Sequence, residues 1–261
     1  MRAIGHHSLD LTGPAGDLAS PVHRLDPRAK IAGLVGVTLV AVTTPLAAWP
    51  VYVACAAALG GVAIAARVGP GVVWRRARVV LPLVLFVAAF VPFIRTGGVT
   101  HDVGPVSVSD DGLATLAAVA AKATIGTVSA VLLGATTSFP AVLRGLAALR
   151  VPRLFTLIAA SMYRYLFVIV EEAGRMRTAL AARAYRPRHA LQAGPVGNAV
   201  TALFLRTYGR GERVHMAMLA RGYHGAMHSL EPLSFRAADG LFVAGLVGSL
   251  LAVRVLAGVA A

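Results

Sequence analysis

The sequence has 261 residues, of which 57% are hydrophobic and only 14% charged, whereas soluble domains average about 25% charged residues. The formal net charge is +14, and its arginines lie between apolar runs, as the positive-inside rule predicts for an inner-membrane protein. This distribution argues against a membrane-tethered nucleic-acid-binding protein, and the single cysteine, Cys55, excludes an intramolecular disulfide framework. Residues 1–29 are polar, so no secretory signal peptide is expected.

Five apolar runs predict membrane-spanning helices. They are residues 31–48, 51–66, 79–94, 113–133 and 240–261. A spanning helix needs about 20 apolar residues, and arginines that snorkel at the ends can extend the shorter runs. Pro82 and Pro92 predict a kink in the third span. The predicted fold class is therefore all-α, a polytopic membrane helix bundle of about five spans with cytoplasmic coupling helices.

The loop charges orient these spans. Residues 1–30 and the connection after the second span carry Lys or Arg, with Arg67, Arg75, Arg76 and Arg78 in the latter, so we expect both in the cytoplasm. Residues 96–112 hold three aspartates and no Lys or Arg, which predicts an outer loop. The expected divisions are a cytoplasmic N-terminal segment (1–30), a four-span region (31–133), a cytoplasmic coupling-helix region (134–239) and a last span (240–261).

Residues 154–170 could form a further span, because they are apolar except for Arg164. Arginines lie on both sides of this run, however, and a crossing would place one basic cluster outside. We therefore favour a helix at or under the inner membrane face, or a re-entrant helix packed on the bundle, and a true span is the alternative.

The 134–239 region is predicted to be mostly helical. Ser138 is a candidate N-cap with Pro140 in the first turn, and Pro152 separates this helix from the next. Residues 184–197 are predicted to be a turn region, and a helix follows from about residue 198 to residue 221. One polar stripe marks that last helix, formed by Arg206, Arg210 and Arg213.

Two helix endings in this region resemble each other. "RMRTALAARAY", residues 175–185, and "RVHMAMLARGY", residues 213–223, match at an offset of 38 positions. A cation in a last helical turn and a glycine after it are ordinary C-terminal features. The repetition favours a second interpretation, in which each arginine projects into a groove of a partner, since its planar fork pairs with carboxylates and its neighbours are small. The residues concerned are Ala182, Arg183, Ala184, Ala220, Arg221 and Gly222.

Four segments carry a resemblance to a known family. "PVHRLDPRAKI", "KATIGTVSAVLLGATTSFPAVLRGLAALRVPRL", "MYRYLFVIVEEAGRMRTALAAR" and "RTYGRGERVHMAMLARGYHG" resemble, in this order, the transmembrane T component of energy-coupling-factor transporters, in particular its cobalt-type CbiQ group. The resemblance extends over most of residues 22–225. It implies a non-catalytic membrane scaffold whose two arginine motifs, at Arg183 and Arg221, each dock on one of two ATPase subunits. Ala184 departs from the family pattern, which has Gly or Ser there.

The resemblance also implies membrane partners. These are a substrate-binding S component of the cobalt type, with a small accessory membrane subunit as a further candidate, and the lipid bilayer; no nucleic acid is expected. Within the same machinery, a T component serving nickel, biotin or other vitamins is an open alternative. A self-sufficient channel or secondary carrier is an alternative from another class.

Other candidate sites are weaker. Neither lysine, Lys30 or Lys122, follows glycine, so a P-loop is excluded, and the first four predicted spans contain no carboxylate for ion coupling. Lys122 is interpreted as a lysine that faces the bundle or water. Glu171 and Glu172 are interpreted as the solvated start of a helix. The histidines are not spaced as a metal cage: His6, His7, His101, His215, His224 and His228. We therefore expect no enzyme, no cofactor and no metal site.

Overall fold

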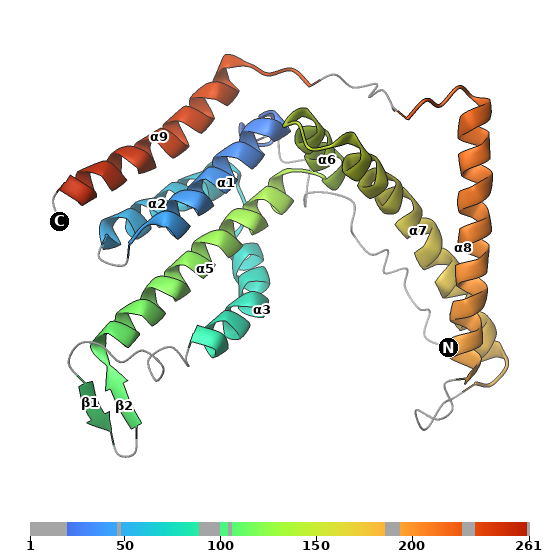
Figure 1. Cartoon of the computed structure of the whole chain (residues 1–261), viewed down its shortest axis with the longest axis horizontal. Helices are drawn as coiled ribbons and strands as arrows, with labels where there is room; N and C mark the ends of the chain where they lie inside the picture. Colours follow the sequence, from blue (N-terminus) through green and yellow to red (C-terminus); the bar gives the residue numbers. More distant parts are fainter. Residues whose placement is uncertain are drawn as a thin grey trace. The chain divides into compact units, whose positions relative to one another are not determined.

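The computed structural model describes residues 20–45, 48–88, 100–103, 106–185, 194–225 and 233–259. The chain divides into two compact units: Met1–Leu149 with Leu233–Ala261, and Arg150–Pro232. Both are built from helices (Figure 1), which confirms the predicted all-α class. One small hairpin in the first unit is the exception among the described residues.

The first unit contains six described helices. Their bounds are α1 (Pro27–Thr43), α2 (Trp49–Ala65), α3 (Pro70–Ala88), α5 (Asp110–Thr136), α6 (Phe139–Ala148) and α9 (Ala237–Val259). Each of the five predicted spans therefore corresponds to a helix, although α3 begins earlier than predicted and the end of its span, with Pro92, lies outside the described residues. Arg75, Arg76 and Arg78 belong to α3 rather than to the predicted connection.

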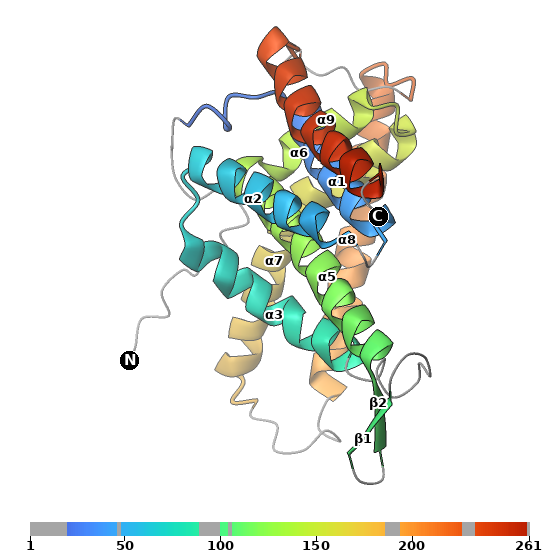
Figure 2. The ribbon, with the colours of Figure 1, turned by 90° about the vertical axis from the view of Figure 1, so that its left-hand side faces the viewer.

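Helix α1 is the centre of the first unit. It packs against α2, α5, α6 and α9, and α3 lies along α5 (Figures 1 and 2). Val37, Val51, Cys55 and Leu132 are completely buried where α1, α2 and α5 meet. The apolar positions of α1 thus face neighbouring helices on several sides, which is the pattern of a helix inside a bundle rather than on its surface.

Glycine allows α1 and α9 to approach closely. A Cβ atom added to Gly36 would lie 2.6 Å from the Cγ2 atom of Val247. Real Cβ atoms do not come this close to another carbon, so only glycine fits without a shift of the Val247 side chain or of one helix. Small residues at contacts of this kind are typical of membrane helix packing, where dispersion and close fit stabilise association in place of the hydrophobic effect.

Among the described residues, three helices have the length and composition of a membrane span. They are Gly112–Thr136 within α5, Arg153–Ala182 (α7) and Ala237–Ala257 within α9. Helices α1 and α2 have 17 residues each, at the lower end of the range that can span, so the count of five spans stays a prediction. Helix α7 meets the requirement although residues 154–170 were expected to lie at the inner face, and its placement also stays a prediction.

The outer loop expected at residues 96–112 contains a short antiparallel hairpin, which the sequence did not predict. Strand β1 (Thr100–Val103) pairs with β2 (Val106–Ser109), with Thr100 opposite Ser109. Helix α5 follows directly at Asp110, so two of the three loop aspartates belong to its first turn. The hairpin therefore connects straight into the longest described helix of the first unit.

The described part of the second unit is formed mainly by two long helices, α7 (Arg153–Ala182) and α8 (Gly194–Ala220), which contact each other. The prediction of a turn up to residue 197 was wrong at its end, because α8 begins at Gly194. Pro195 is compatible with this start, since a helix tolerates proline in its first turn, where the missing N–H has no intrahelical partner. Neither helix has a buried residue among those described.

Candidate functional site

The end of α7 is closed by a pair of backbone hydrogen bonds around Arg183. Arg183 is the C-cap residue, the N–H of Ala184 donates to the carbonyl oxygen of Ala181 over 3.0 Å, and the N–H of Tyr185 donates to that of Leu180 over 3.1 Å. Ala184 adopts a left-handed conformation with φ 55°. These features define a Schellman motif, in which a left-handed residue reverses the chain and satisfies the last helical carbonyls.

The end of α8 repeats this geometry. Arg221 is followed by Gly222 at φ 78°. The N–H of Gly222 donates to Leu219 and the N–H of Tyr223 donates to Met218, both over 3.0 Å. The two endings that match in sequence therefore match in structure residue by residue, with an arginine, a left-handed small residue and a tyrosine in the same order.

The side chains of Arg183 and Arg221 are exposed, and neither has a hydrogen-bond or ion-pair partner within the described part of the chain. The residues on each side of them in the motifs are alanine or glycine and are also exposed. Each guanidinium group is thus presented at a helix tip with little bulk beside it. Such a group can donate two parallel hydrogen bonds to a carboxylate of a partner.

Comparison with known proteins identifies the family of this chain. Residues 19–232 match the family described as cobalt transport protein CbiQ. The cobalt transport protein CbiQ of Rhodobacter capsulatus is 31% identical over 171 residues, which cover 64% of this chain and 69% of that protein. The chain belongs to the CbiQ family. It is accordingly a multi-pass membrane component of cobalt transport, which agrees with its long apolar helices.

A longer relative contains a similar region. A protein of Methanocorpusculum labreanum, described as a fused cobalt transport protein CbiMQ, is 26% identical over 251 residues, which cover 92% of this chain. The matched region is 42% of that fused protein, so this CbiQ-family chain spans less than half of its length.

An ion-pair cluster joins the two helices that carry the arginine motifs. Glu172 of α7 binds Arg175 on its own helix and Arg206 on α8, and Glu171 binds Arg175 over 2.6 Å. The expectation that Glu171 and Glu172 form the solvated start of a helix was wrong, because both lie inside α7. The side chain of Glu172 is only 14% exposed, so this carboxylate fixes a point of contact between α7 and α8.

Lys122 and Arg254 donate hydrogen bonds to the last backbone carbonyls of α1 in the first unit. The Nζ atom of Lys122 on α5 donates to the carbonyl oxygen of Val42 over 2.9 Å, and Arg254 on α9 donates to the side-chain and backbone oxygens of Thr43. These carbonyls have no intrahelical partner, and cations favour the negative end of the helix dipole. The interpretation of Lys122 as a bundle-facing lysine is confirmed, and its contacts assign it a packing role.

A polar junction, formed by His23, Asp26, Lys30, Thr136 and Asp239, marks the start of α1. The Nζ atom of Lys30 donates to the carbonyl oxygens of His23 and Thr136, both over 3.1 Å, and Asp26 caps α1 by accepting from the N–H of Arg28 over 2.8 Å. Burial of the imidazole and the nearby charge of Lys30 lower the pKa of His23 below its usual value. The sequence signal for the cap was present, since an Asp before Pro27 is a typical helix start.

The remaining candidates are the histidines and Cys55. The described residues hold no group of three or more His, Cys, Asp or Glu side chains that could bind a metal ion. His6, His7, His228 and the side chain of His101 lie outside the described part of the chain. Cys55 is a free, buried cysteine of the first unit.

Proposed function

We propose that this chain is the transmembrane T component of an energy-coupling-factor importer for cobalt. In this role it transmits ATP hydrolysis, performed by two separate ATPase subunits, to a substrate-binding membrane subunit. One observation carries the proposal: α7 and α8 end in the same Schellman motif, and each presents an exposed arginine without a partner among the described residues, Arg183 or Arg221. Two equivalent tips fit two equivalent partner subunits.

The proposed mechanism follows from the way in which the tips are built. Each ATPase subunit would hold one guanidinium group in an acidic groove, where a bidentate pair fixes orientation as well as position. Because each arginine is the C-cap of a long helix, displacement of the tip moves the whole helix. Approach of the two ATPases on binding ATP would therefore drive α7 and α8 relative to one another, and the Glu172–Arg206 ion pair lies where these two helices meet.

The proposed membrane partner is a CbiM-type subunit, the S component of this importer, together with a small accessory membrane subunit. The fused relative supports this assignment, since its name combines CbiM and CbiQ in one chain and this chain matches 42% of it. In this arrangement residues 1–30 and 134–239 face the cytoplasm, where the ATPases are. The chain itself is not a P-loop ATPase, because its sequence has no Gly-Lys-Ser/Thr phosphate-binding loop, so the ATPases of this proposal are separate chains.

The test is reconstitution of cobalt uptake in proteoliposomes. Uptake of radioactive cobalt should require the chain, its two ATPases, its CbiM-type partner and ATP together, and nickel or biotin should not replace cobalt. Cobalt flux through the chain alone would identify a self-sufficient carrier and contradict the proposal.

A further inference from the structure

A groove between α7 and α8 has two chemically different walls. It encloses about 1040 Å³, which is the size of a pocket for a small organic ligand. The first wall is the apolar face of α7, where Ile158, Met162 and Leu166 follow one another at four-residue spacing. These side chains are 49%, 67% and 39% exposed, so the described residues leave them largely uncovered.

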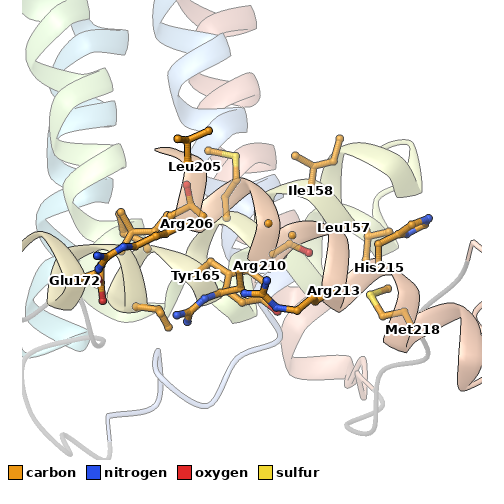
Figure 3. A pocket seen from close by; sticks show the side chains of 18 of the residues that line it. Leu157, Ile158, Tyr165, Glu172, Leu205, Arg206, Arg210, Arg213, His215 and Met218 are labelled. Atoms are coloured by element: carbon orange, nitrogen blue, oxygen red, sulfur yellow. Dashed lines mark hydrogen bonds and ion pairs between the residues drawn. The ribbon is translucent and has the colours of Figure 1, made fainter. Parts of the chain in front are cut away.

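The second wall is cationic and belongs to α8. Arg206, Arg210 and Arg213 line the groove at four- and three-residue spacing, and therefore share one face of the helix. Figure 3 shows the labelled charged side chains in sequence from Glu172 through Arg206 and Arg210 to Arg213. Arg206 is neutralised by Glu172, whereas Arg210 and Arg213 have no ion-pair partner within the described part of the chain. The two latter arginines are free to bind an anion.

The combination of these walls selects an amphiphilic anion. An apolar surface alone would fit any hydrophobic segment, and arginines alone would fit any phosphate. Here the two lie in one groove, and the helix that supplies the apolar wall is long and apolar enough to enter a membrane. An anionic phospholipid meets both requirements, with its phosphate on the two arginines and an acyl chain along α7. Arginine in particular suits this contact, since its fork matches phosphate geometry.

We propose that the α7–α8 groove binds an anionic phospholipid, with the headgroup phosphate held by Arg210 and Arg213 and the acyl chain lying on Ile158, Met162 and Leu166. The bound lipid would contact both helices that end in the arginine motifs. This site does not depend on the identity of the ATPase partners, so it can be tested on the full chain by itself.

The experiment is native mass spectrometry of the purified full chain, titrated with phosphatidylglycerol or phosphatidylcholine in detergent. The unmodified chain should retain phosphatidylglycerol in preference to phosphatidylcholine. The affinity of the double variant Arg210→Gln/Arg213→Gln for phosphatidylglycerol should be lower by about tenfold or more. Both arginines contact the lipid phosphate in the proposed site, and each contributes to the affinity for an anionic lipid. Met162→Ser should weaken binding as well, without changing the charge.

The matched control is Arg164→Gln/Arg177→Gln, which removes the same charge from exposed positions of α7 outside the groove. It should retain lipid like the unmodified chain, and circular dichroism should show equal helix content in all variants. Equal loss of lipid in this control, or no loss in the Arg210/Arg213 variant, would overturn the proposal.

Two further results would also overturn it. If glycerol 3-phosphate displaces the lipid as effectively as free phosphatidylglycerol does, the groove binds a phosphate and not a lipid. If a photo-crosslinking amino acid at Met162 in the assembled transporter captures a protein subunit instead of phospholipid, the groove is a protein interface. Capture of phospholipid at Met162, lost in the Arg210/Arg213 variant, supports the site.

Discussion

The carboxylate of Asp239 accepts a hydrogen bond of 2.8 Å from the backbone N–H of Asp26, which lies 213 positions earlier in the chain. Its second oxygen accepts from the N–H of Arg236 over 2.7 Å, at the start of α9. One buried side chain, 2% exposed, therefore satisfies the first backbone donors of two helices and joins α9 to α1.

Replacement of Asp239 by alanine should strongly destabilise the first unit. The buried N–H of Asp26 and the partly buried N–H of Arg236 would lose their acceptor. A buried donor without a partner costs about 1–3 kcal/mol and a partly buried one less, so we expect a loss of about 2 kcal/mol. Unfolding of the purified chain in mixed micelles measures this value. Glu212→Ala, which removes an exposed carboxylate from α8, is the control and should be nearly neutral. Equal stability of both variants would show that Asp239 does not hold the two helices together.

A methyl group at Gly36 should separate α1 from α9. The Cβ atom of Gly36→Ala would lie 2.6 Å from Val247, and overpacking of this kind costs about 1–3 kcal/mol. Gly248→Ala is the matched control, because Gly248 lies on α9 with open space around it, and this change should be neutral or slightly stabilising. Val247→Ala should restore the stability of Gly36→Ala in a double-mutant cycle. A fully additive cycle would mean that the two residues do not compete for space.

Local signals in the sequence predicted the helices of this protein well, and contacts between distant segments less well. Apolar runs located α1, α2, α5 and α9, and the repeat at Arg183 and Arg221 located two helix ends with the same backbone geometry. Both signals depend on neighbours within a few residues.

The Asp239–Asp26 hydrogen bond could not be predicted in this way, because it depends on how α1 and α9 pack. The same holds for the position of Lys122 at the end of α1 and for the groove in which Ile158 faces the arginines of α8. The early start of α8 was missed for another reason. Pro195 and two nearby glycines are typical of turns, but a proline in the first turn is also compatible with a helix.

The two helix ends should respond in opposite ways to exchange of their left-handed residue. Ala184 adopts φ 55°, which costs a side chain with a Cβ atom about 1 kcal/mol, whereas Gly222 adopts φ 78° without that cost. Ala184→Gly should therefore stabilise the end of α7, and Gly222→Ala should destabilise the end of α8 by a similar amount. Amide hydrogen exchange at Tyr185 and Tyr223, the donors of the closing hydrogen bonds, measures both effects. Faster exchange at Tyr185 in Ala184→Gly would contradict the prediction.

Acidification should weaken the junction at the start of α1. Burial and the charge of Lys30 lower the pKa of His23 in the folded chain, so the unfolded chain binds a proton first as the pH falls. The contribution of neutral His23 to stability is therefore complete above its usual pKa, near 6.5, and is lost as the pH falls from there through the lowered value. His23→Gln should show a smaller loss of thermal stability than the unmodified chain between pH 7.5 and pH 5. Parallel curves for the two chains would exclude His23 as the cause.

Charge reversal at either helix tip should uncouple transport from ATP hydrolysis. Arg183→Glu or Arg221→Glu would place a carboxylate where the proposed ATPase groove is acidic, so repulsion replaces a bidentate pair. We expect each variant to reduce cobalt uptake and ATPase co-purification at least tenfold, and the double variant to abolish both. The variants should still insert in the membrane, since both side chains are exposed and without partners among the described residues.

Arg177→Glu, an exposed charge reversal inside α7, is the control and should retain most of the uptake. Normal uptake in both single variants would show that neither arginine takes part in coupling. Loss of uptake in only one variant would show that the two helix ends, although equal in backbone geometry, have different functions.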